Sequence, residues 1–261
     1  MRGARRAFAR DVVPVDSLHG RASNRASRQG SGFEAARRAL GSYRHRVTNA
    51  AAFKAMAAAI DCELSLEAAE QLLAYLDAML DENQRINLTA VREREAAVMF
   101  HALDSVAMGS AAFGLEVTAC LDLGTGNGFP GVAALCLYPE AEVVLMDRTL
   151  KKLKAIERAL DVAGLTSERV RTVQMNAIEA PKHGHKRKYD LVAARAVGDA
   201  FEVGLLARPL LTQAGSFLCW MSPEQRAKSK KPEAYREPEF IEYTLPEPAA
   251  RERVLAHYRR P

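Results

Sequence analysis

The sequence predicts an α/β fold with a doubly wound, mostly parallel sheet, antiparallel C-terminal strands and a small N-terminal helical unit. Three observations lead to this prediction. Short apolar runs alternate with helical stretches from Val117 onward, which is typical of parallel sheets. A glycine-rich loop, LDLGTGNGFPG at 121–131, follows the first of these runs. The last two β-rich runs lie close together in the chain, so we expect them to pair antiparallel.

The N-terminal segment, residues 1–48, differs in composition from the rest of the chain. Residues 1–50 hold eleven Arg, no Lys and three acids, a charge of +8, whereas the whole chain carries +5. Few large apolar residues occur there, so we expect disorder. Three interpretations stay open: a basic RNA-contacting tail, a transit-like sequence, or a true start site downstream, for example at Met56.

A helical unit is expected at residues 49–115, ahead of a second domain at 116–261. Its strongest helix covers 64–80, where apolar residues recur at i, i+3 and i+4 and Ser65 is a good N-cap. Polar residues at 83–89 break this pattern. A second helix, 93–111, carries His101 and Asp104.

The second domain alternates strands and helices along its length. The pattern predicts strands at 117–124, 141–147, 169–174, 189–195, 215–221, 239–245 and 251–258. It predicts helices at 129–137, 149–164 and 199–210, the second of them ending at Gly164. Three prolines and many charges predict a loop at 222–238.

The glycine-rich loop fits two ligand patterns. Gly126, Gly128 and Gly131 match G-x-G-x-x-G, which binds dinucleotides. In the other register, Asp122, Gly124, Gly126 and Gly128 match D-x-G-x-G-x-G. A carboxylate at Asp122 would oppose a pyrophosphate but would favour an amine and a sulfonium. The pattern therefore favours S-adenosylmethionine, with glycines that let the backbone approach the ligand.

Polar groups at the ends of the next two strands fit the same ligand. Asp147 ends one strand, where its two oxygens can accept both hydroxyls of a ribose. NAD and S-adenosylmethionine both contain such a ribose, so Asp147 does not discriminate between them. Backbone groups of Ala177 and Ile178, after the third strand, could bind the edge of an adenine.

Composition excludes several classes of protein. No apolar run approaches the ~18 residues of a membrane span. The cysteines, at positions 62, 120, 136 and 219, form no CxxC pair and have no His at ligand spacing. We therefore expect a reduced, soluble, cytoplasmic protein without a metal.

The sequence resembles the bacterial 16S ribosomal RNA guanine-N7 methyltransferases, the glucose-inhibited division protein B family. The resemblance runs from about Leu66 to Tyr258 and implies a Rossmann-like class I methyltransferase fold. It rests on five stretches: NQRINLTAV (83–91), HALDS (101–105), LDLGTGNGFPG (121–131), VLMD (144–147) and YDLVAARAV (189–197).

The resemblance also implies roles for single residues. The cofactor contacts would be Gly124, Phe129, Ala177, Ile178 and Arg195, with Asp147 on the ribose. Arg195 stands where such folds place a residue of the catalytic face. His101, Asp104 and Asn87 are candidates for substrate binding. A buried hydrogen-bonded pair explains His101 and Asp104 equally well, and Asn83 and Asn87 could simply shape a turn. Met221 and Ser222 replace the Lys-Gly pair that is usual in the family.

Methyl transfer to guanine N7 needs no general base, because N7 already carries a free lone pair. Catalysis should come from alignment and desolvation, with Arg195 holding a phosphate, O6 or the cofactor carboxylate. The partner would be 16S ribosomal RNA or the small ribosomal subunit, and nothing demands more than a monomer. Lys151, Lys152 and Lys154 could hold RNA phosphates, and Phe129, Trp220 or Tyr138 could stack on a base.

Three alternatives stay open. The chain could be a methyltransferase that acts on a small molecule or a protein, since the glycine loop alone does not choose the substrate. It could be an NAD(P)-dependent oxidoreductase on a similar sheet. It could also be a non-enzymatic scaffold that has kept a nucleotide-binding fold.

Overall fold

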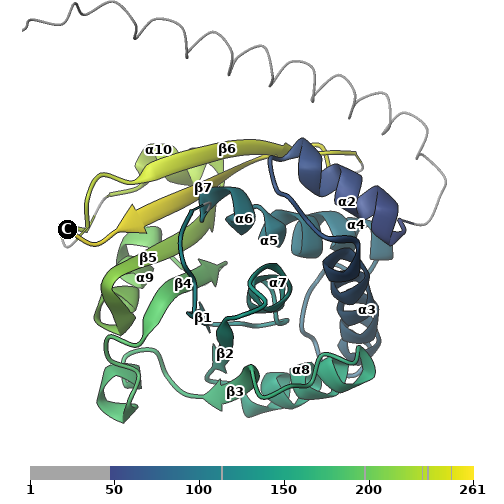
Figure 1. The fold of residues 1–261 in the computed structure, drawn as a ribbon, viewed down its shortest axis with the longest axis horizontal. Coiled ribbons are helices and arrows are strands. Elements are labelled where there is room, and N and C mark those ends of the chain that lie inside the picture. Colours follow the sequence, from purple (N-terminus) through teal and green to yellow (C-terminus); the bar gives the residue numbers. More distant parts are fainter. Residues whose placement is uncertain (1–47, 113, 197, 231, 234, 248) are drawn as a thin grey trace, which may run out of the picture.

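The computed structural model describes residues 48–261 apart from positions 113, 197, 231, 234 and 248, so the predicted arm at 1–48 lies almost wholly outside the described residues. A seven-stranded sheet in the order β3-β2-β1-β4-β5-β7-β6 forms the centre of the fold (Figure 1). Strands β1 to β5 pair in parallel, while β7 pairs antiparallel with both β5 and β6. This topology confirms the predicted fold class.

The strands lie close to their predicted positions. Their bounds are β1 Ala119–Leu123, β2 Glu142–Asp147, β3 Val170–Gln174, β4 Tyr189–Arg195, β5 Leu211–Met221, β6 Glu239–Leu245 and β7 Arg251–Arg259. Successive side chains point to opposite faces, as strands require: Cys120 joins one buried cluster and Leu121 the other. Both faces are therefore covered.

Helices cover the two faces unequally. The larger cluster packs α2 (Ala50–Ala59), α3 (Leu66–Asn83), α7 (Gly131–Leu137) and α8 (Leu150–Val162) on one face. On the other face lie α9 (Ala200–Ala207) and the short helices η2 (Ala180–His183) and η3 (Arg208–Leu210). Helix α8 begins and ends within two residues of the predicted 149–164, and Gly164 follows it at φ +68°.

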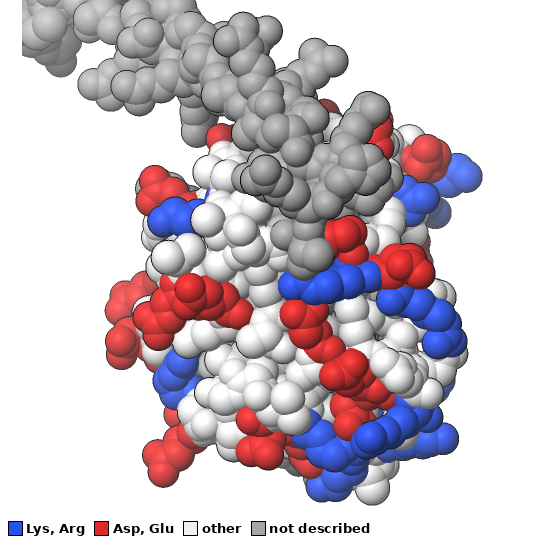
Figure 2. All heavy atoms as spheres, turned by 90° about the vertical axis from the view of Figure 1, so that its right-hand side faces the viewer, with Lys and Arg blue, Asp and Glu red and all other residues white. Residues whose placement is uncertain are grey.

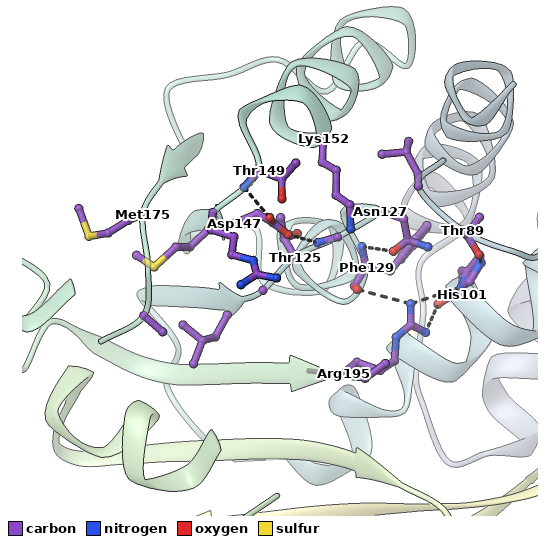
Figure 3. Close-up of a pocket in the computed structure, with 18 of the residues that line it drawn as sticks. Thr89, His101, Thr125, Asn127, Phe129, Asp147, Thr149, Lys152, Met175 and Arg195 are labelled. Carbon is purple, nitrogen blue, oxygen red and sulfur yellow. Dashed lines mark hydrogen bonds between the residues drawn. The ribbon is translucent and has the colours of Figure 1, made fainter. Parts of the chain in front are cut away.

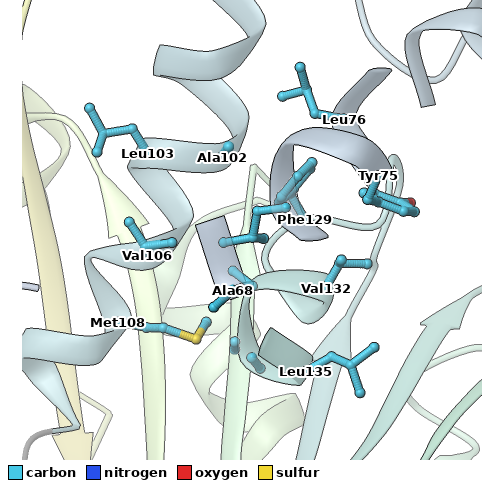
Figure 4. Packing of buried hydrophobic residues seen from close by; sticks show 14 of the residues in the cluster. Ala68, Tyr75, Leu76, Ala102, Leu103, Val106, Met108, Phe129, Val132 and Leu135 are labelled. Carbon is cyan, nitrogen blue, oxygen red and sulfur yellow. The ribbon is translucent and has the colours of Figure 1, made fainter. Parts of the chain in front are cut away.

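The N-terminal helices share the larger core with the sheet. Figure 4 shows Tyr75 and Leu76 of α3 close to Phe129 and to Val132 of α7. The Tyr75 hydroxyl donates to the carbonyl of Asn127 at 2.9 Å, and its ring meets Phe129 edge to face at 5.4 Å. Helix α3 thus supports the glycine-rich loop directly.

Two predicted elements were wrong in detail. The expected helix at 93–111 is interrupted: α4 (Arg94–Ala97), the π-helix η1 (Val98–Leu103), α5 (Asp104–Val106) and α6 (Met108–Ala111) follow one another. The expected loop at 222–238 contains α10 (Pro223–Lys228), which Ser222 and Gln225 begin with a capping box. The prolines and charges of this stretch are typical of a loop, so the sequence pattern did not indicate the short helix.

No helix in the described ranges is long and apolar enough to cross a membrane.

Candidate functional site

A cavity of about 690 Å³ lies at the carboxyl ends of the parallel strands. Ligands of α/β sheets bind at this edge, and the volume is that of a small-molecule site. Its lining includes Thr89, Phe100, His101, Asp104, Gly124, Thr125, Gly126, Asn127, Phe129, Asp147, Thr149, Lys152, Met175, Asn176, Ala177, Arg195 and Arg253 (Figure 3).

The glycine-rich loop forms the floor of this cavity. The amides of Gly124 and Thr125 both donate to the carbonyl of Met146, each at 2.9 Å, and tie the loop to β2. Gly124 and Gly126 have φ of +77° and +57°, a region that side chains disfavour. These two glycines therefore present bare backbone to the cavity, as the sequence predicts.

Asp122 does not line the cavity, which corrects the prediction that it faces a ligand. Its side chain is fully buried beneath the loop. It accepts a hydrogen bond from the Thr125 hydroxyl at 2.7 Å and one from the Gly131 amide at 2.7 Å. The carboxylate thus holds the two ends of the loop together, and its other oxygen has no partner among the described residues.

Burial raises the pKa of Asp122 to about 7, against hydrogen bonds from Thr125 and Gly131 that lower it. Because the unfolded chain ionises near pH 3.8, the ionised form destabilises the fold as the pH rises from about 4 to about 7. One pKa unit corresponds to about 1.4 kcal/mol, so the cost is on the order of a few kcal/mol. Asp122→Asn keeps an acceptor for the Gly131 amide and does not titrate.

We expect the free energy of unfolding of Asp122→Asn, relative to the unchanged protein, to rise between pH 4.5 and pH 7.5. Urea unfolding of both proteins at the two pH values measures the difference. Parallel pH dependence of the two stabilities would contradict the elevated pKa.

Asp147 lines the cavity at the end of β2. One of its oxygens accepts from the Gly126 amide at 3.2 Å, and the other accepts from the Thr149 amide at 2.8 Å. Each carboxylate oxygen can accept a further bond. The side chain is therefore held in place with acceptor capacity left for a ligand that carries hydroxyl donors.

Of the two residues predicted to contact an adenine, one lines the cavity and the other does not. Ala177 lines the cavity together with Asn176, whereas Ile178 does not and is 67% exposed. The Ile178 amide donates to the Asn176 side chain at 3.2 Å. This bond shapes the turn after β3 and occupies the amide that the sequence assigned to an adenine.

Arg195 ends β4, and its guanidinium is buried among protein acceptors. It donates to the carbonyl of Phe100 at 2.7 Å and, over 3.3–3.4 Å, to those of His101 and Phe129. Phe100 and His101 belong to the π-helix η1. A π-turn changes which carbonyls stay free and is frequent at functional sites. Arg195 thus fastens η1 and the glycine loop to the sheet.

Asp104 is the anion at the centre of this region. Its carboxylate accepts hydrogen bonds from Nε and Nη2 of Arg253 at 2.9 Å each, from the Tyr243 hydroxyl at 2.6 Å and from Arg195 at 3.4 Å. Its carbonyl accepts from the Trp220 indole at 2.7 Å. Asp104 is the first residue of α5 and directly follows η1. It therefore joins this helical stretch to β4, β6 and β7 through a buried ionic network.

His101 lies beside the network and lines the same cavity. Burial and the Arg195 guanidinium lower the pKa of His101 to about 3, so the ring is neutral at physiological pH. Its Nε2 lies 2.9 Å from the Thr89 hydroxyl, and its Nδ1 faces Arg195 at 3.5 Å.

Several predicted contacts do not face the cavity. Gly128 packs against Tyr75, since a Cβ there would lie 1.9 Å from the hydroxyl. Asn87 is exposed and lies outside the cavity, whereas the Asn83 side chain accepts from the amides of Leu88 and Thr89 and shapes the turn. Trp220 is buried in the core. The half-buried Tyr138 packs against the same core.

The surface formed by α3 and α8 carries both signs of charge (Figure 2). Arg158 pairs with Glu82 at 2.6 Å and Lys154 pairs with Glu157 at 2.9 Å. An RNA-binding surface is expected to have one sign of charge. Of the three lysines singled out in the sequence, Lys152 lines the cavity.

Sequence reasoning missed Thr89, Asn127 and Arg253 as residues that line the cavity, and it assigned Lys152 to RNA phosphates. Thr89 and Asn127 lie inside the stretches 83–91 and 121–131, so their position alone could have indicated them. Arg253 is 149 residues away from Asp104 in the sequence, and no local sequence pattern predicts a pair at such a separation.

The family model and the curated relatives that match this chain carry the same family name. A sequence model of the family described as rRNA small subunit methyltransferase G matches residues 68–249. The ribosomal RNA small subunit methyltransferase G of Desulfitobacterium hafniense is 34% identical over 66% of this chain and 72% of its own length. That of Leptothrix cholodnii is 33% identical over 64% and 73%. Among solved structures, a putative methyltransferase from Escherichia coli matches with a TM-score of 0.47 and 18% identity, covering 60% of this chain and 85% of that one.

Proposed function

The chain belongs to the rRNA small subunit methyltransferase G family, and we propose its function from this membership and from the cavity described above. The chain is an enzyme that methylates ribosomal RNA, and the reaction we propose is methyl transfer from S-adenosylmethionine to N7 of a guanine in 16S ribosomal RNA. The observation that carries the cofactor assignment is the pairing of bare glycine backbone with a fixed acceptor, Asp147, in one cavity.

The residues of the cavity fit S-adenosylmethionine. Asp147 has acceptor capacity for the ribose hydroxyls, Gly124 and Gly126 leave room beside the loop, and Met175 and Ala177 offer apolar surface near the end of β3. We assign these groups to the cofactor, and we no longer assign Asp122, Gly128 or Ile178 to it.

S-adenosylmethionine supplies an electrophilic methyl group when it is bound. The chain's own residues have to hold the accepting nitrogen in line and keep water out, which can lower a barrier by several kcal/mol. His101 is neutral and is therefore compatible with a position near N7, because a cation there would oppose the positive charge that develops on N7. Arg195 is engaged by carbonyls, so we propose that it positions η1 and Phe129 rather than touching N7.

The partner that follows from this function is 16S ribosomal RNA or the small ribosomal subunit. We propose that the helical unit 49–115 works as part of the site, because η1 supplies Phe100 and His101 to the cavity. We propose a monomer, since one chain supplies the complete set of residues described above.

A methyl-transfer assay tests the function. Purified protein, tritiated S-adenosylmethionine and small-subunit RNA or particles from cells that lack the activity are combined, and the RNA is digested to nucleosides. We expect labelled 7-methylguanosine. Label on another nucleoside, or none on either substrate, would overturn the proposed reaction.

A second prediction concerns cofactor binding. Asp147→Asn should weaken binding of S-adenosylhomocysteine by about 10- to 100-fold, because a hydrogen bond to a charged group is worth about 1.5–3 kcal/mol. Calorimetric titration measures the dissociation constant. Asp161→Asn, an exposed acid on α8, is the matched control and should bind like the unchanged protein. Equal affinity of all three proteins would remove Asp147 from the cofactor site.

A further inference from the structure

The cavity has two unlike sides. In Figure 3, Asp147 and Met175 lie on one side of Thr125 and Phe129, whereas Thr89, His101 and Arg195 lie on the other. If the nucleoside of the cofactor is bound at Asp147, the second side is where the methyl acceptor has to lie. The Thr89 hydroxyl is among the polar groups that line this cavity, and no role has been assigned to it above.

The tautomer of His101 decides what this hydroxyl can do. An arginine can only donate hydrogen bonds, so we assign the lone pair to the His101 Nδ1, which faces Arg195 at 3.5 Å. The ring is neutral, and its single proton therefore lies on Nε2. In this tautomer Nε2 donates its proton to the Thr89 oxygen, which lies 2.9 Å away.

The Thr89 oxygen accepts a second hydrogen bond. The Val91 amide donates to it at 3.1 Å. A hydroxyl has two acceptor sites and one proton, so both acceptor sites are filled. Within the described ranges the hydroxyl has these two partners, and both donate to it. Its own proton is left for an acceptor in the cavity.

We propose that the Thr89 hydroxyl donates a hydrogen bond to O6 of the target guanine and so selects guanine over adenine. This inference rests on the proposed function. Guanine carries two acceptors side by side, N7 and O6, whereas adenine has a donor, the N6 amine, next to N7. A fixed donor beside the methyl acceptor site pairs with O6 and opposes the adenine amine. Arg195 and His101 act through Thr89 and are positioning residues.

The test pairs a change in the protein with a change in the RNA. The methylated guanine is first located, and RNAs are then ligated that carry guanine, inosine or 2-aminopurine at that position. Inosine keeps O6, and 2-aminopurine keeps N7 but lacks O6. Each RNA is methylated by the unchanged protein, by Thr89→Val, which loses the hydroxyl, and by Thr89→Ser, which keeps it. Affinity for S-adenosylhomocysteine is measured for all three.

We expect Thr89→Val to lower kcat/KM on guanine and inosine by tenfold or more, since loss of the donor leaves O6 of the bound base unpaired. On 2-aminopurine, already a poor substrate, the same variant should match the unchanged protein. Thr89→Ser should retain most of the activity on guanine. Affinity for S-adenosylhomocysteine should be the same in all three.

An equal loss on all three RNAs, unaltered activity on guanine, or weaker cofactor binding by Thr89→Val would each overturn the assignment of Thr89 to O6. These outcomes differ from failure of the proposed function. In that case the unchanged protein would methylate none of the RNAs, and the assignment would fall with it.

Discussion

Asp104→Ala is expected to lower the free energy of unfolding by roughly 3–5 kcal/mol, because breaking a buried ion pair leaves an uncompensated charge. Asp104 is 2% exposed and faces the guanidinium groups of both Arg195 and Arg253. The alanine would leave both cations without their anion and would also leave the Tyr243 hydroxyl without its acceptor. Urea denaturation followed by circular dichroism measures the change.

The chain offers a matched control in Asp77. Its two oxygens accept from Nε and Nη2 of Arg94 at 2.6 and 3.0 Å, which is the same forked geometry as the pair of Asp104 with Arg253. The Asp77 side chain is 49% exposed, so water can replace its partner. Asp77→Ala should cost less than about 1 kcal/mol. Similar costs for the two variants would contradict the view that burial gives Asp104 its importance.

The parallel sheet was predictable because each strand is short, apolar and bounded by loops or helices. Both faces of a parallel sheet are covered, so its strands read as continuous apolar runs such as VVLM. Helix α3 was predictable for a related reason: its apolar face repeats at the helical period over 18 residues. These signals are local and survive in a single sequence.

The interrupted helix at 94–111 was not predictable in the same way. A π-turn inserts a residue into the helical repeat, and Val98–Leu103 are almost all apolar whichever period is assumed. The Phe100 carbonyl within this turn accepts a hydrogen bond from the Arg195 guanidinium at 2.7 Å. A partner 95 residues away leaves no trace in the local pattern.

The site residues likewise differ in whether a local sequence signal predicts their position. Asp147 and the glycines at 124 and 126 follow from where strands end, and the structure places them at the cavity. Asp122 fits the ligand pattern equally well, yet its carboxylate turns beneath the loop to Thr125 and Gly131. Asp122 lies within β1 rather than at its end, so the alternation of the strand directs its side chain to the face of Cys120 and α7.

Gly128→Ala is expected to combine loss of stability with loss of ligand binding. The added Cβ would lie 1.9 Å from the Tyr75 hydroxyl and 2.7 Å from its ring, on a backbone with φ of +90°. Tyr75 is fully buried and donates to Asn127, so it has little room to move. Overpacking and left-handed backbone strain together predict a loss of roughly 2–4 kcal/mol. Movement of Asn127 and Phe129 should also close part of the cavity.

Gly164→Ala separates the two causes, because this glycine has φ of +68° and no neighbouring atom within 4 Å of the added Cβ. It should lose only the roughly 1–2 kcal/mol of backbone strain and bind S-adenosylhomocysteine normally. Urea unfolding and calorimetric titration of both variants measure the two effects. If Gly128→Ala were no less stable than Gly164→Ala and bound the ligand equally well, the contact between Tyr75 and the glycine loop could not be what holds Asn127 and Phe129 in place. The expected result would instead mean that the N-terminal helix α3 shapes the cavity through a single tyrosine.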